Sequence, residues 1–370
     1  MSSEDCEYGL SKQVHSAGIS APEYDYLPRL PNTFRPKVGL IGAGGVTEYH
    51  LRAYRALGLQ VVAICDLDAR RAQSRREQFF PNAVTTTDFR DVLRREEIEV
   101  VDVALHPEHR GPVVEASISA GKHVLSQKPF VTDLNDGLRL IELADKRRVK
   151  LAVNQNGRCA PHFAYALAAA RSGALGEIGT VDFNLLFDHS WTIGTPFENI
   201  HHLLLYDFGI HWFDLASCFL PDDGPHEVYA RVSRLPYQKA RPPFAASVII
   251  NSTASQVRLS LNGAVSLGQT DRTLIAGSLG TLESTGPSLS EQRVVLATAA
   301  GVASPQLRGT WFENGFQGTM CELLCAIEEG REPRNSARGN IRSLELCFAA
   351  VRSANTGLPV RSGAVRTLPQ

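Results

Sequence analysis

The chain is predicted to combine an α/β domain, built on a parallel sheet, with a second domain of the α+β class. Apolar and helical segments alternate from Lys37 to Asn154, whereas strand-like segments follow one another through short turns after about residue 157. Alternation is typical of a parallel sheet covered on both faces, and successive strands favour an antiparallel sheet. We therefore expect an extended arm over 1–36, a first domain over 37–156 and a second domain over 157–370.

The first domain is expected to alternate five strands with five helices. Its last helix is the best marked, because Asp133 and Asp136 at its start and Lys146 to Arg148 at its end complement the helix dipole. Ligands of such sheets bind at the carboxyl ends of the strands, so a site is expected there. The strands are predicted at 38–41, 61–65, 100–105, 123–126 and 151–154, and the helices at 46–57, 69–79, 88–94, 111–120 and 133–147.

The second domain is expected to hold one helix, then a sheet, then two C-terminal helices. The helices are predicted at 160–171, 320–329 and 340–354, and the strands at 180–187, 227–232, 246–251, 256–261, 272–276, 281–284 and 293–297.

In the N-terminal arm, Pro22, Pro28, Pro31 and Pro36 indicate an extended segment. Its aromatic cluster (Tyr24, Tyr26) suggests contact with a surface of its own chain or a neighbour's, and a partly disordered tail is the alternative.

Composition and charge exclude several classes of partner. The chain has 370 residues, of which 43 % are hydrophobic and 21 % charged, with a net charge of −1. Nothing in this balance indicates nucleic acid or an anionic membrane surface, and no apolar run reaches the ~18 residues of a membrane span. Seven scattered cysteines and an acidic N-terminus without an apolar leader predict reduced thiols and a cytoplasmic location. Cys321 and Cys325 lack a second pair, so no zinc site is expected.

A glycine-rich turn joins the first predicted strand to the first predicted helix, in the sequence Val38-Gly-Leu-Ile-Gly-Ala-Gly-Gly-Val46. Backbone N–H groups at such a helix start point at a phosphate, and the helix dipole favours its charge. The turn is therefore a candidate dinucleotide site formed by Gly42, Gly44, Gly45 and Val46. Thr47 stands where a third glycine is usual, and a purely structural turn is the alternative.

An acidic residue follows the second predicted strand at the spacing that a ribose requires. Asp66 lies 24 positions after Gly42 (66 − 42). A carboxylate there accepts hydrogen bonds from ribose hydroxyls and repels a 2′-phosphate, which favours NAD over NADP. Arg70 and Arg71 follow closely and keep NADP open as the less favoured cofactor. A helix-capping aspartate is the alternative for Asp66, although Asp68 is better placed for capping.

The first candidate catalytic residue is a lysine at the end of a strand. In the sequence Gly121-Lys-His-Val-Leu-Ser-Gln-Lys-Pro-Phe130, Pro129 holds the preceding residue extended. Because this end belongs to the carboxyl edge of the sheet, the Lys128 ammonium can point into a cleft and polarise an alkoxide. A surface lysine is the alternative.

The second candidate lies in an apolar segment from His201 to Cys218. If the segment is helical, Asp207 and His211 share one face, which Asp214 continues. An unpaired polar stripe on a buried helix is costly, so it needs partners or a ligand. An acid–base histidine tuned by an aspartate and an Asp–His pair satisfied in the core are both open. A metal site is a third alternative, formed by His201, His202, Asp207 and His211.

From about residue 37 to its end, the chain resembles the glucose–fructose oxidoreductase and inositol dehydrogenase family, often called Gfo/Idh/MocA. The resemblance implies a Rossmann dinucleotide-binding domain and a second domain with a large, open, mostly antiparallel sheet that often joins subunits. It also implies NAD or NADP, a sugar or polyol substrate, and a homo-oligomer, as a dimer or a tetramer. It rests on the glycine turn with His50, Ile64-Cys-Asp-Leu-Asp68, Pro107-Glu-His109, Gly121–Phe130, Arg158-Cys-Ala-Pro161 and Asp207-Phe-Gly-Ile-His-Trp-Phe-Asp214.

Matched position by position, the resemblance assigns roles to single residues. Lys128 corresponds to the family's catalytic lysine, in a Lys–Pro peptide that is often cis, and His211 corresponds to its acid–base histidine beside Asp207. Gln127 replaces the family's glutamate and removes a charge beside Lys128. The further expected cofactor contacts are His106, Pro107, His109, Gln127 and Lys128, and the expected substrate contacts are Lys128, Arg158, Asp207 and His211. Four expected contacts are not part of the family pattern: Asn156 for the cofactor, and His189, Trp191 and His202 for the substrate, which offer hydrogen bonds and an aromatic stacking surface.

These observations together predict an NAD-dependent oxidoreductase that moves a hydride between nicotinamide and a secondary hydroxyl or ketone of a sugar, glycoside or cyclitol. Oxidation at C3 of a glycoside is one form of this reaction. A lyase or glycosidase that retains NAD and oxidises its substrate only transiently is the first alternative. A cofactor-binding regulator is the second, and the presence of Lys128, Asp207 and His211 together argues against it.

Overall fold

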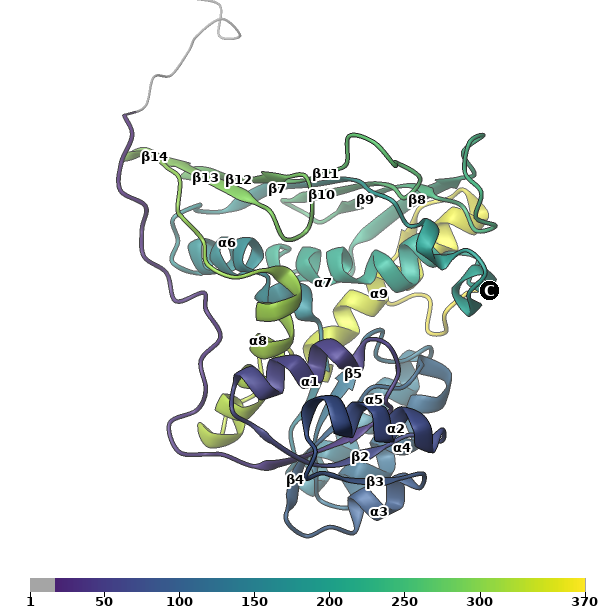
Figure 1. Cartoon of the computed structure of the whole chain (residues 1–370). Coiled ribbons are helices and arrows are strands. Elements are labelled where there is room, and N and C mark those ends of the chain that lie inside the picture. The colour runs from purple at the N-terminus through teal and green to yellow at the C-terminus, as the bar shows by residue number, and fades with distance from the viewer. Residues whose placement is uncertain (1–16, 370) are drawn as a thin grey trace, which may run out of the picture.

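The computed structural model describes residues 17–369, which form two sheets with helices packed between and around them (Figure 1). A six-stranded parallel sheet has the order β3-β2-β1-β4-β5-β6, and a nine-stranded sheet has the order β14-β13-β12-β11-β7-β10-β9-β8-β15. The predicted fold class, a Rossmann-like parallel sheet followed by a mostly antiparallel one, is confirmed.

The strand order of the first sheet reverses at β1 (Lys37–Ile41), which pairs with β2 on one side and with β4 on the other. This switch in strand order opens a crevice at the carboxyl ends of the strands, where Gly42 and Asp66 follow β1 and β2. The remaining elements are α1 (Thr47–Ala56), β2 (Gln60–Cys65), α2 (Ala69–Phe79), β3 (Val84–Thr86), α3 (Phe89–Leu93), β4 (Ile98–Val103), α4 (Pro107–Ser119), β5 (His123–Gln127), α5 (Leu134–Arg147) and β6 (Leu151–Asn154).

The second sheet is antiparallel except where β7 (Ile178–Leu186) pairs in parallel with β10 (Gln256–Asn262). In the described part of the chain, helices cover one face of this sheet and none lies on the other (Figure 1). The other strands are β8 (Glu227–Ser233), β9 (Ala245–Asn251), β11 (Thr270–Gly277), β12 (Gly280–Gly286), β13 (Arg293–Thr298), β14 (Gly301–Ala303) and β15 (Val360–Arg361).

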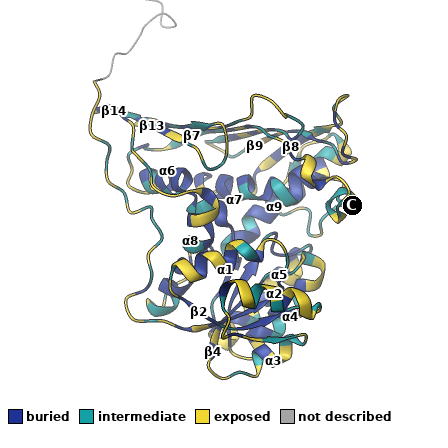
Figure 2. Ribbon diagram, in the orientation of Figure 1, coloured by how far each residue is buried: buried dark blue, intermediate teal, exposed yellow. Residues whose placement is uncertain are grey.

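The helices of the second domain lie between its sheet and the first domain. Figure 2 shows α7 (Ile210–Phe219) and α9 (Ala337–Thr356) buried over much of their length in this middle layer. A short 3₁₀ turn, η1 (Asn156–Cys159), leads from β6 into α6 (Pro161–Arg171). The other short turns are η2 (Ser190–Thr192), η3 (Pro196–Asn199) and the π-helical η4 (Leu204–Phe208).

One late helix, α8 (Trp311–Glu328), belongs to the core of the first domain although it lies far from it in the sequence. Phe316, Met320 and Leu323 are buried in one cluster with residues of β1, α1 and β2. The helix begins nine residues before the predicted start at 320, because Gly315 and Gly318 obscure its helical pattern. Those glycines are required by packing, since a Cβ on Gly315 would lie 2.9 Å from the Asn156 carbonyl oxygen.

The described part of the N-terminal arm lies along its own chain. Gly18 bridges to Val302, and the Tyr24 ring contacts Tyr165 at 5.0 Å between ring centroids. Glu328 on α8 accepts the backbone N–H groups of Asn32, Thr33 and Phe34, which lowers the pKa of its carboxyl to about 2. The sequence left open whether the arm contacts its own chain or a neighbour's, and the described part of the arm contacts its own chain.

The predicted helical segment around His211 differs from a continuous α-helix. Residues 204–208 form a π-helical turn, and α7 starts only after Gly209. A Cβ on Gly209 would lie 2.5 Å from the Leu204 carbonyl oxygen, so this tight junction needs glycine. The strands β3, β14 and β15 were not predicted, since each has only two or three residues. Within residues 17–369, no helix is both long enough and apolar enough to cross a membrane.

Candidate active site

The glycine turn forms a cradle at the start of α1. Gly42 has φ +96°, and a Cβ there would lie 2.5 Å from the Ala104 carbonyl oxygen, so only glycine fits. A Cβ on Gly44 or Gly45 would meet nothing within 4 Å. Among the described residues, the N–H groups of Gly44, Gly45 and Val46 have no hydrogen-bond partner. The turn therefore offers open space and free donors, which fit the pyrophosphate of a dinucleotide.

Thr47, in place of the third glycine, is accommodated without opening the turn. Its side chain is fully buried, and its hydroxyl donates to the Gly44 carbonyl oxygen at 2.6 Å. Threonine at this position gives up the close helix–strand packing that a glycine allows, and its hydroxyl adds a hydrogen bond that holds the turn.

Asp66 lies beside this turn at the carboxyl end of β2. Its Oδ2 accepts the Ala43 N–H at 2.7 Å, and its Oδ1 accepts the Asp68 N–H at 2.9 Å. Each carboxylate oxygen keeps a further lone pair for a hydroxyl group. Asp68 caps α2 by accepting the Arg70 N–H at 3.0 Å, so the capping role belongs to Asp68, as expected.

Lys128 and Asp207 form an ion pair across the two domains. The Lys128 ammonium donates to the Asp207 carbonyl oxygen at 2.8 Å and to its Oδ1 at 3.2 Å, and both side chains are largely buried. The Lys128–Pro129 peptide bond is cis, as the resemblance implied. Asp207 is contributed by the π-helical turn η4, so this turn fixes the direction of the carboxylate.

A buried arginine that no motif marks in the sequence binds the backbone of the lysine loop, residues 128–130. The Arg110 guanidinium donates to the carbonyl oxygens of Lys128 and Phe130 at 3.3 Å each, and also to that of Pro129. Burial lowers the pKa of Arg110 to about 10, so the group stays charged at neutral pH. Its only sequence signal is an arginine at the start of a helix.

His211 lies at the start of α7 with an unsatisfied ring nitrogen. Its Nδ1 is buried and has no hydrogen-bond partner among the described residues. Burial, with the Lys128 charge as a second cause, lowers the pKa of His211 well below its usual value. The Asp–His pair that the sequence left open does not form, because Asp207 bonds to Lys128 instead. The ring crosses Trp311 edge-to-face with centroids 5.7 Å apart.

A buried polar network in the first domain supports Lys128, and both ring nitrogens of its histidine have partners, although Asp102 Oδ1 has none among the described residues. The His50 Nδ1–H donates to Asp102 Oδ2 at 2.6 Å, and the Tyr54 hydroxyl donates to the same oxygen at 2.6 Å. The Gln127 amide nitrogen lies 3.1 Å from His50 Nε2, and the amide oxygen accepts the Lys128 N–H at 2.7 Å. Gln127 thus connects the backbone of the lysine to the buried histidine. In the sequence, His50 stands out only as part of the family pattern, and no motif marks Asp102 or Tyr54.

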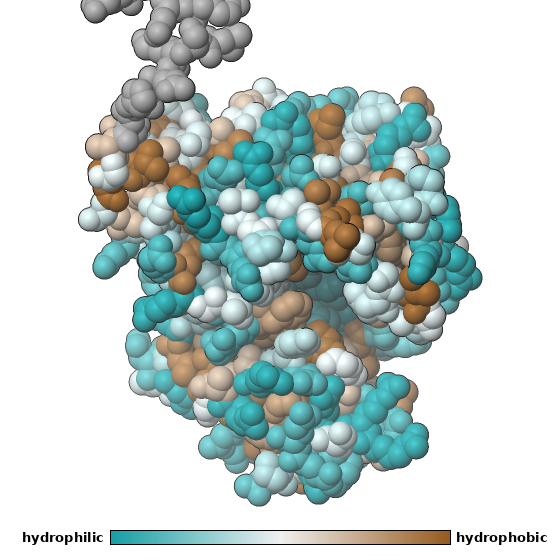
Figure 3. Space-filling model, turned by 45° about the horizontal axis from the view of Figure 1, so that its top comes forward, coloured by the Kyte–Doolittle hydropathy of each residue, from teal (hydrophilic) through white to brown (hydrophobic). Residues whose placement is uncertain are grey.

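His189 and Trp191 lie on the second-domain side of the same region. Burial lowers the pKa of His189 to about 4, and the charges of Asp207 and Lys128 act on it in opposite directions. Its ring packs against Phe208 and Trp191 with centroids 5.0 and 5.2 Å apart. Trp191 is 57 % exposed, so it offers a free aromatic face. The space-filling view shows the surface hollowed between the two domains (Figure 3).

The structure places several other expected contacts away from Lys128 and His211. Arg158 bonds to Asp214 and lines a separate cavity that contains neither of those two residues. His202 Nε2 lies 2.6 Å from Asn355 Oδ1 on α9.

Of the remaining expected cofactor contacts, the Asn156 side-chain oxygen accepts the indole N–H of Trp311 at 3.0 Å. His106 and His109 are exposed at the start of α4. His106 precedes Pro107, the first helical residue, and its side chain makes no capping hydrogen bond.

The metal alternative has no support in the described part of the chain. Within residues 17–369, no group of three or more His, Cys, Asp and Glu side chains is arranged to hold a metal ion. Of the four residues considered for a metal site, Asp207 bonds to Lys128 and His202 bonds to Asn355.

Comparison with known proteins agrees with this geometry. Residues 36–155 match the model of an oxidoreductase family with an NAD-binding Rossmann fold, and residues 163–283 match the GFO/IDH/MocA C-terminal domain. The chain belongs to this family. Its first domain is therefore an NAD-binding Rossmann domain, and its free N–H donors at the glycine turn are consistent with that role.

Curated relatives cover most of the chain. D-apiose dehydrogenase of Paraburkholderia graminis is 28 % identical over 88 % of this chain and 89 % of its own length. An inositol 2-dehydrogenase of Rhizobium meliloti is 26 % identical over 86 % of this chain and 96 % of its own length. A solved oxidoreductase from Agrobacterium radiobacter, in complex with NAD⁺, L-tartaric acid and magnesium, has a TM-score of 0.79 at 23 % identity. It covers 90 % of this chain and 99 % of its own, and the likeness shows the fold.

Proposed function

We propose that the protein is an NAD-dependent dehydrogenase that interconverts a secondary hydroxyl and a ketone on a sugar, glycoside or cyclitol. The observation that carries the proposal is the cluster of an ammonium held by Asp207 with a neutral histidine whose ring nitrogen is unsatisfied. Two relatives that match most of the chain are dehydrogenases of D-apiose and of inositol, which places polyhydroxylated substrates first.

The roles of the side chains follow from their charges. When bound, the nicotinamide supplies the hydride acceptor. His211 is neutral at pH 7, because burial and the Lys128 charge lower its pKa, and it accepts the proton of the substrate hydroxyl. The Lys128 ammonium stabilises the developing alkoxide, and Asp207 orients that ammonium. Aromatic Trp191 and the polar edge of His189 offer the stacking and hydrogen bonding that a sugar ring uses.

NAD is proposed over NADP. The Asp66 carboxylate stands at the end of β2, where it would face a 2′-phosphate with a like charge. Arg70 is bonded to Asp68 at 3.2 Å and is therefore not a free cation for that phosphate.

We also propose a homo-oligomer that assembles through the open face of the second sheet, in the cytoplasm. Support for the assembly comes from this face, on which residues 17–369 place no helix. Support for the location comes from the six described cysteines, all of which are free thiols. Light scattering during gel filtration tests the assembly, and a monomeric mass would overturn it.

The decisive experiment screens monosaccharides, glycosides and inositols with NAD and with NADP, recording absorbance at the nicotinamide band. A dehydrogenase accumulates NADH in proportion to ketone product, and NAD supports a higher kcat/KM than NADP. Product formed without NADH would instead identify the alternative of a lyase or glycosidase that oxidises its substrate transiently. Glycosides are included because oxidation at C3 of a glycoside is one of the proposed reactions, and product analysis identifies the carbon.

A further inference from the structure

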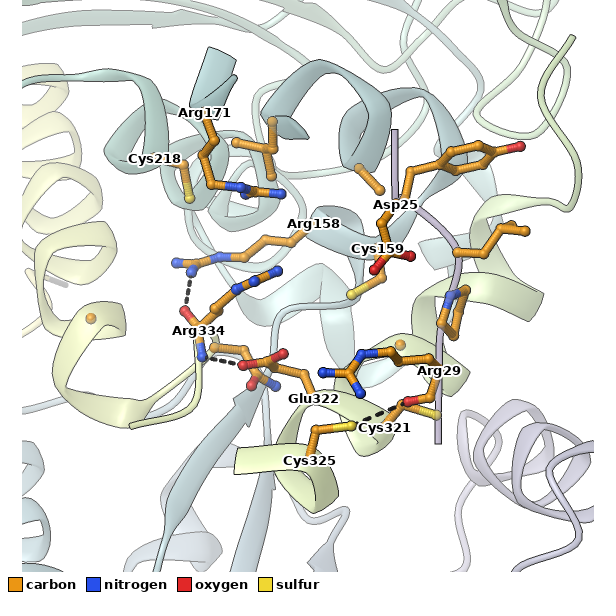
Figure 4. Close-up of a pocket in the computed structure, with 18 of the residues that line it drawn as sticks. Asp25, Arg29, Arg158, Cys159, Arg171, Cys218, Cys321, Glu322, Cys325 and Arg334 are labelled. Carbon is orange, nitrogen blue, oxygen red and sulfur yellow. Dashed lines mark hydrogen bonds between the residues drawn. The ribbon is translucent and has the colours of Figure 1, made fainter. Parts of the chain in front are cut away.

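A separate cavity, of about 450 Å³, is lined by neither Lys128 nor His211. Its walls come from the N-terminal arm at residues 25–29, from η1, from helices α6 to α9, and from the segment 331–335 between α8 and α9 (Figure 4). None of the residues that line it belongs to the glycine turn or to the cluster of Lys128, Asp207 and His211. Its size is within the ordinary range of small-molecule sites.

The cavity carries a strong excess of positive charge. Six arginines and only two carboxylate residues, Asp25 and Glu322, line it. Four of the arginines are neutralised by carboxylates, in the pairs Arg29–Glu329, Arg158–Asp214, Arg331–Glu322 and Arg342–Asp222.

Arg171 and Arg334 are the two that lack such a partner within residues 17–369. They approach each other closely enough to interact, because after burial the Arg334 charge is the next cause that lowers the pKa of Arg171. Figure 4 shows Arg158, Arg171 and Arg334, from three different segments, gathered on one side of the cavity. The arrangement brings two unneutralised guanidinium groups together in one recess.

The position of Arg334 is fixed by its backbone. The Arg334 carbonyl oxygen accepts from Arg158 Nη1 at 2.6 Å, and its N–H donates to Glu322 Oε1 at 2.8 Å. Both bonds are drawn in Figure 4. Because these contacts leave the Arg334 guanidinium unused, the site is organised before any ligand binds.

The cysteines of the cavity do not supply the missing negative charge. Burial raises the pKa of the Cys159 and Cys321 thiols to about 12, and those of Cys218 and Cys325 are raised as well. All four thiols are therefore neutral at pH 7. Asp25, the other carboxylate in the lining, forms no ion pair with Arg171 or Arg334, so both guanidinium groups remain available to an anion from outside the described chain.

We propose that this cavity is a binding site for a small organic anion, whose phosphate or carboxylate group bonds to Arg171 and Arg334. Guanidinium groups bind such oxyanions through paired N–H donors, a geometry that lysine does not offer. Leu27, Pro28 and Leu167 provide an apolar wall for a short carbon skeleton. The proposal does not depend on the reaction proposed above.

Calorimetric titration of the full chain, saturated with NAD⁺ so that the glycine turn is filled, tests the proposal. Inorganic phosphate and citrate are the two probes, and each is titrated once in dilute buffer and once in the same buffer with 0.3 M KCl. Saturable binding of at least one probe is expected, and KCl should weaken it because both arginines are partly exposed. Phosphate alone would indicate a phosphate ester as the natural ligand, and citrate alone would indicate a polycarboxylate.

The double variant Arg171→Gln/Arg334→Gln should raise the Kd at least tenfold for the probe that binds. Arg147→Gln is the matched control, because Arg147, like Arg171, is an exposed arginine at the last position of its helix without an ion pair within residues 17–369, and it should leave the affinity unchanged. Both changes remove exposed groups, so folding should be preserved, and circular dichroism verifies it. Absence of saturable heat with either probe, or equal affinity in the double variant, would overturn the proposal.

Discussion

Two histidines near the boundary between the domains differ in how their ring nitrogens are satisfied. His50 is fully buried, with Nδ1 bonded to Asp102 and Nε2 facing the Gln127 amide. His211 has a buried Nδ1 without a hydrogen-bond partner among the described residues. Asp207, four positions before it in the sequence, bonds to Lys128, and Asp214, three positions after it, bonds to Arg158.

This difference separates a supporting group from an acting one. A buried polar atom without a partner costs about 1–3 kcal/mol, so it persists mainly where function requires it. The His50 network bears no such cost at either ring nitrogen, and through Gln127 it fixes the backbone of Lys128. We infer that His50 supports the site, whereas His211 performs chemistry in it.

The largest expected effect is on turnover in His211→Ala. Removing the proposed proton acceptor should lower kcat by about 10²–10⁴-fold. The affinity for NAD, measured by fluorescence titration, should be unchanged because the glycine turn and Asp66 are distant in the fold. His201→Ala is the control, since His201 is exposed. Unchanged turnover in His211→Ala would remove this residue from the mechanism.

The next effect is on stability in His50→Phe. The substitution leaves the buried Asp102 with Tyr54 as its remaining partner, and loss of a hydrogen bond to a charged group costs about 1.5–3 kcal/mol. Urea unfolding should show this loss, whereas His211→Ala should lose less, because it removes ring packing against Trp311 and breaks no hydrogen bond within residues 17–369. If His50→Phe unfolds at the wild-type midpoint, the supporting role assigned to His50 is wrong.

Lys128→Met should change both the rate and its pH dependence. Loss of the ammonium should lower kcat by about 10²–10³-fold, as for other groups that stabilise an oxyanion. Because the Lys128 charge lowers the pKa of His211, its removal should move the acid limb of the kcat/KM profile to higher pH. Lys146→Met, at an exposed helix end, should change neither quantity. An unshifted acid limb would show that the titrating group is not His211.

The smallest effect concerns acid stability through His162, a histidine outside the site. Burial lowers its pKa to about 3, so in acid the unfolded chain binds a proton that the folded chain does not. Stability is therefore lost as pH falls from about 6.5 towards 3. Between pH 7.5 and 5.5, His162→Phe should lose about 1 kcal/mol less than the wild type in urea unfolding, and His201→Gln should match the wild type. Equal losses in all three proteins would contradict the assignment.

Local signals in the sequence were sufficient for most elements of the first domain, with the three-residue strand β3 as the exception. The helix at 69–79 was predicted with the observed bounds, because Asp68 caps it and its apolar positions have helical spacing. Strand β6 was also predicted with its observed bounds. The start of α8 was not, because the glycines that let it pack against Asn156 and Cys159 are weak helix formers. The requirement for them comes from segments about 160 residues earlier.

The sequence by itself determined the family, the glycine turn, the acidic residue after the second strand, and which residue types stand at the catalytic positions. These features depend on neighbours along the chain, whose spacing is visible in the sequence. Only the tertiary structure decided that Asp207 bonds to Lys128 rather than to His211, that Arg110 holds the lysine loop, and that Arg158 lines another cavity. Such pairings join residues from different elements, and packing sets their distances and directions.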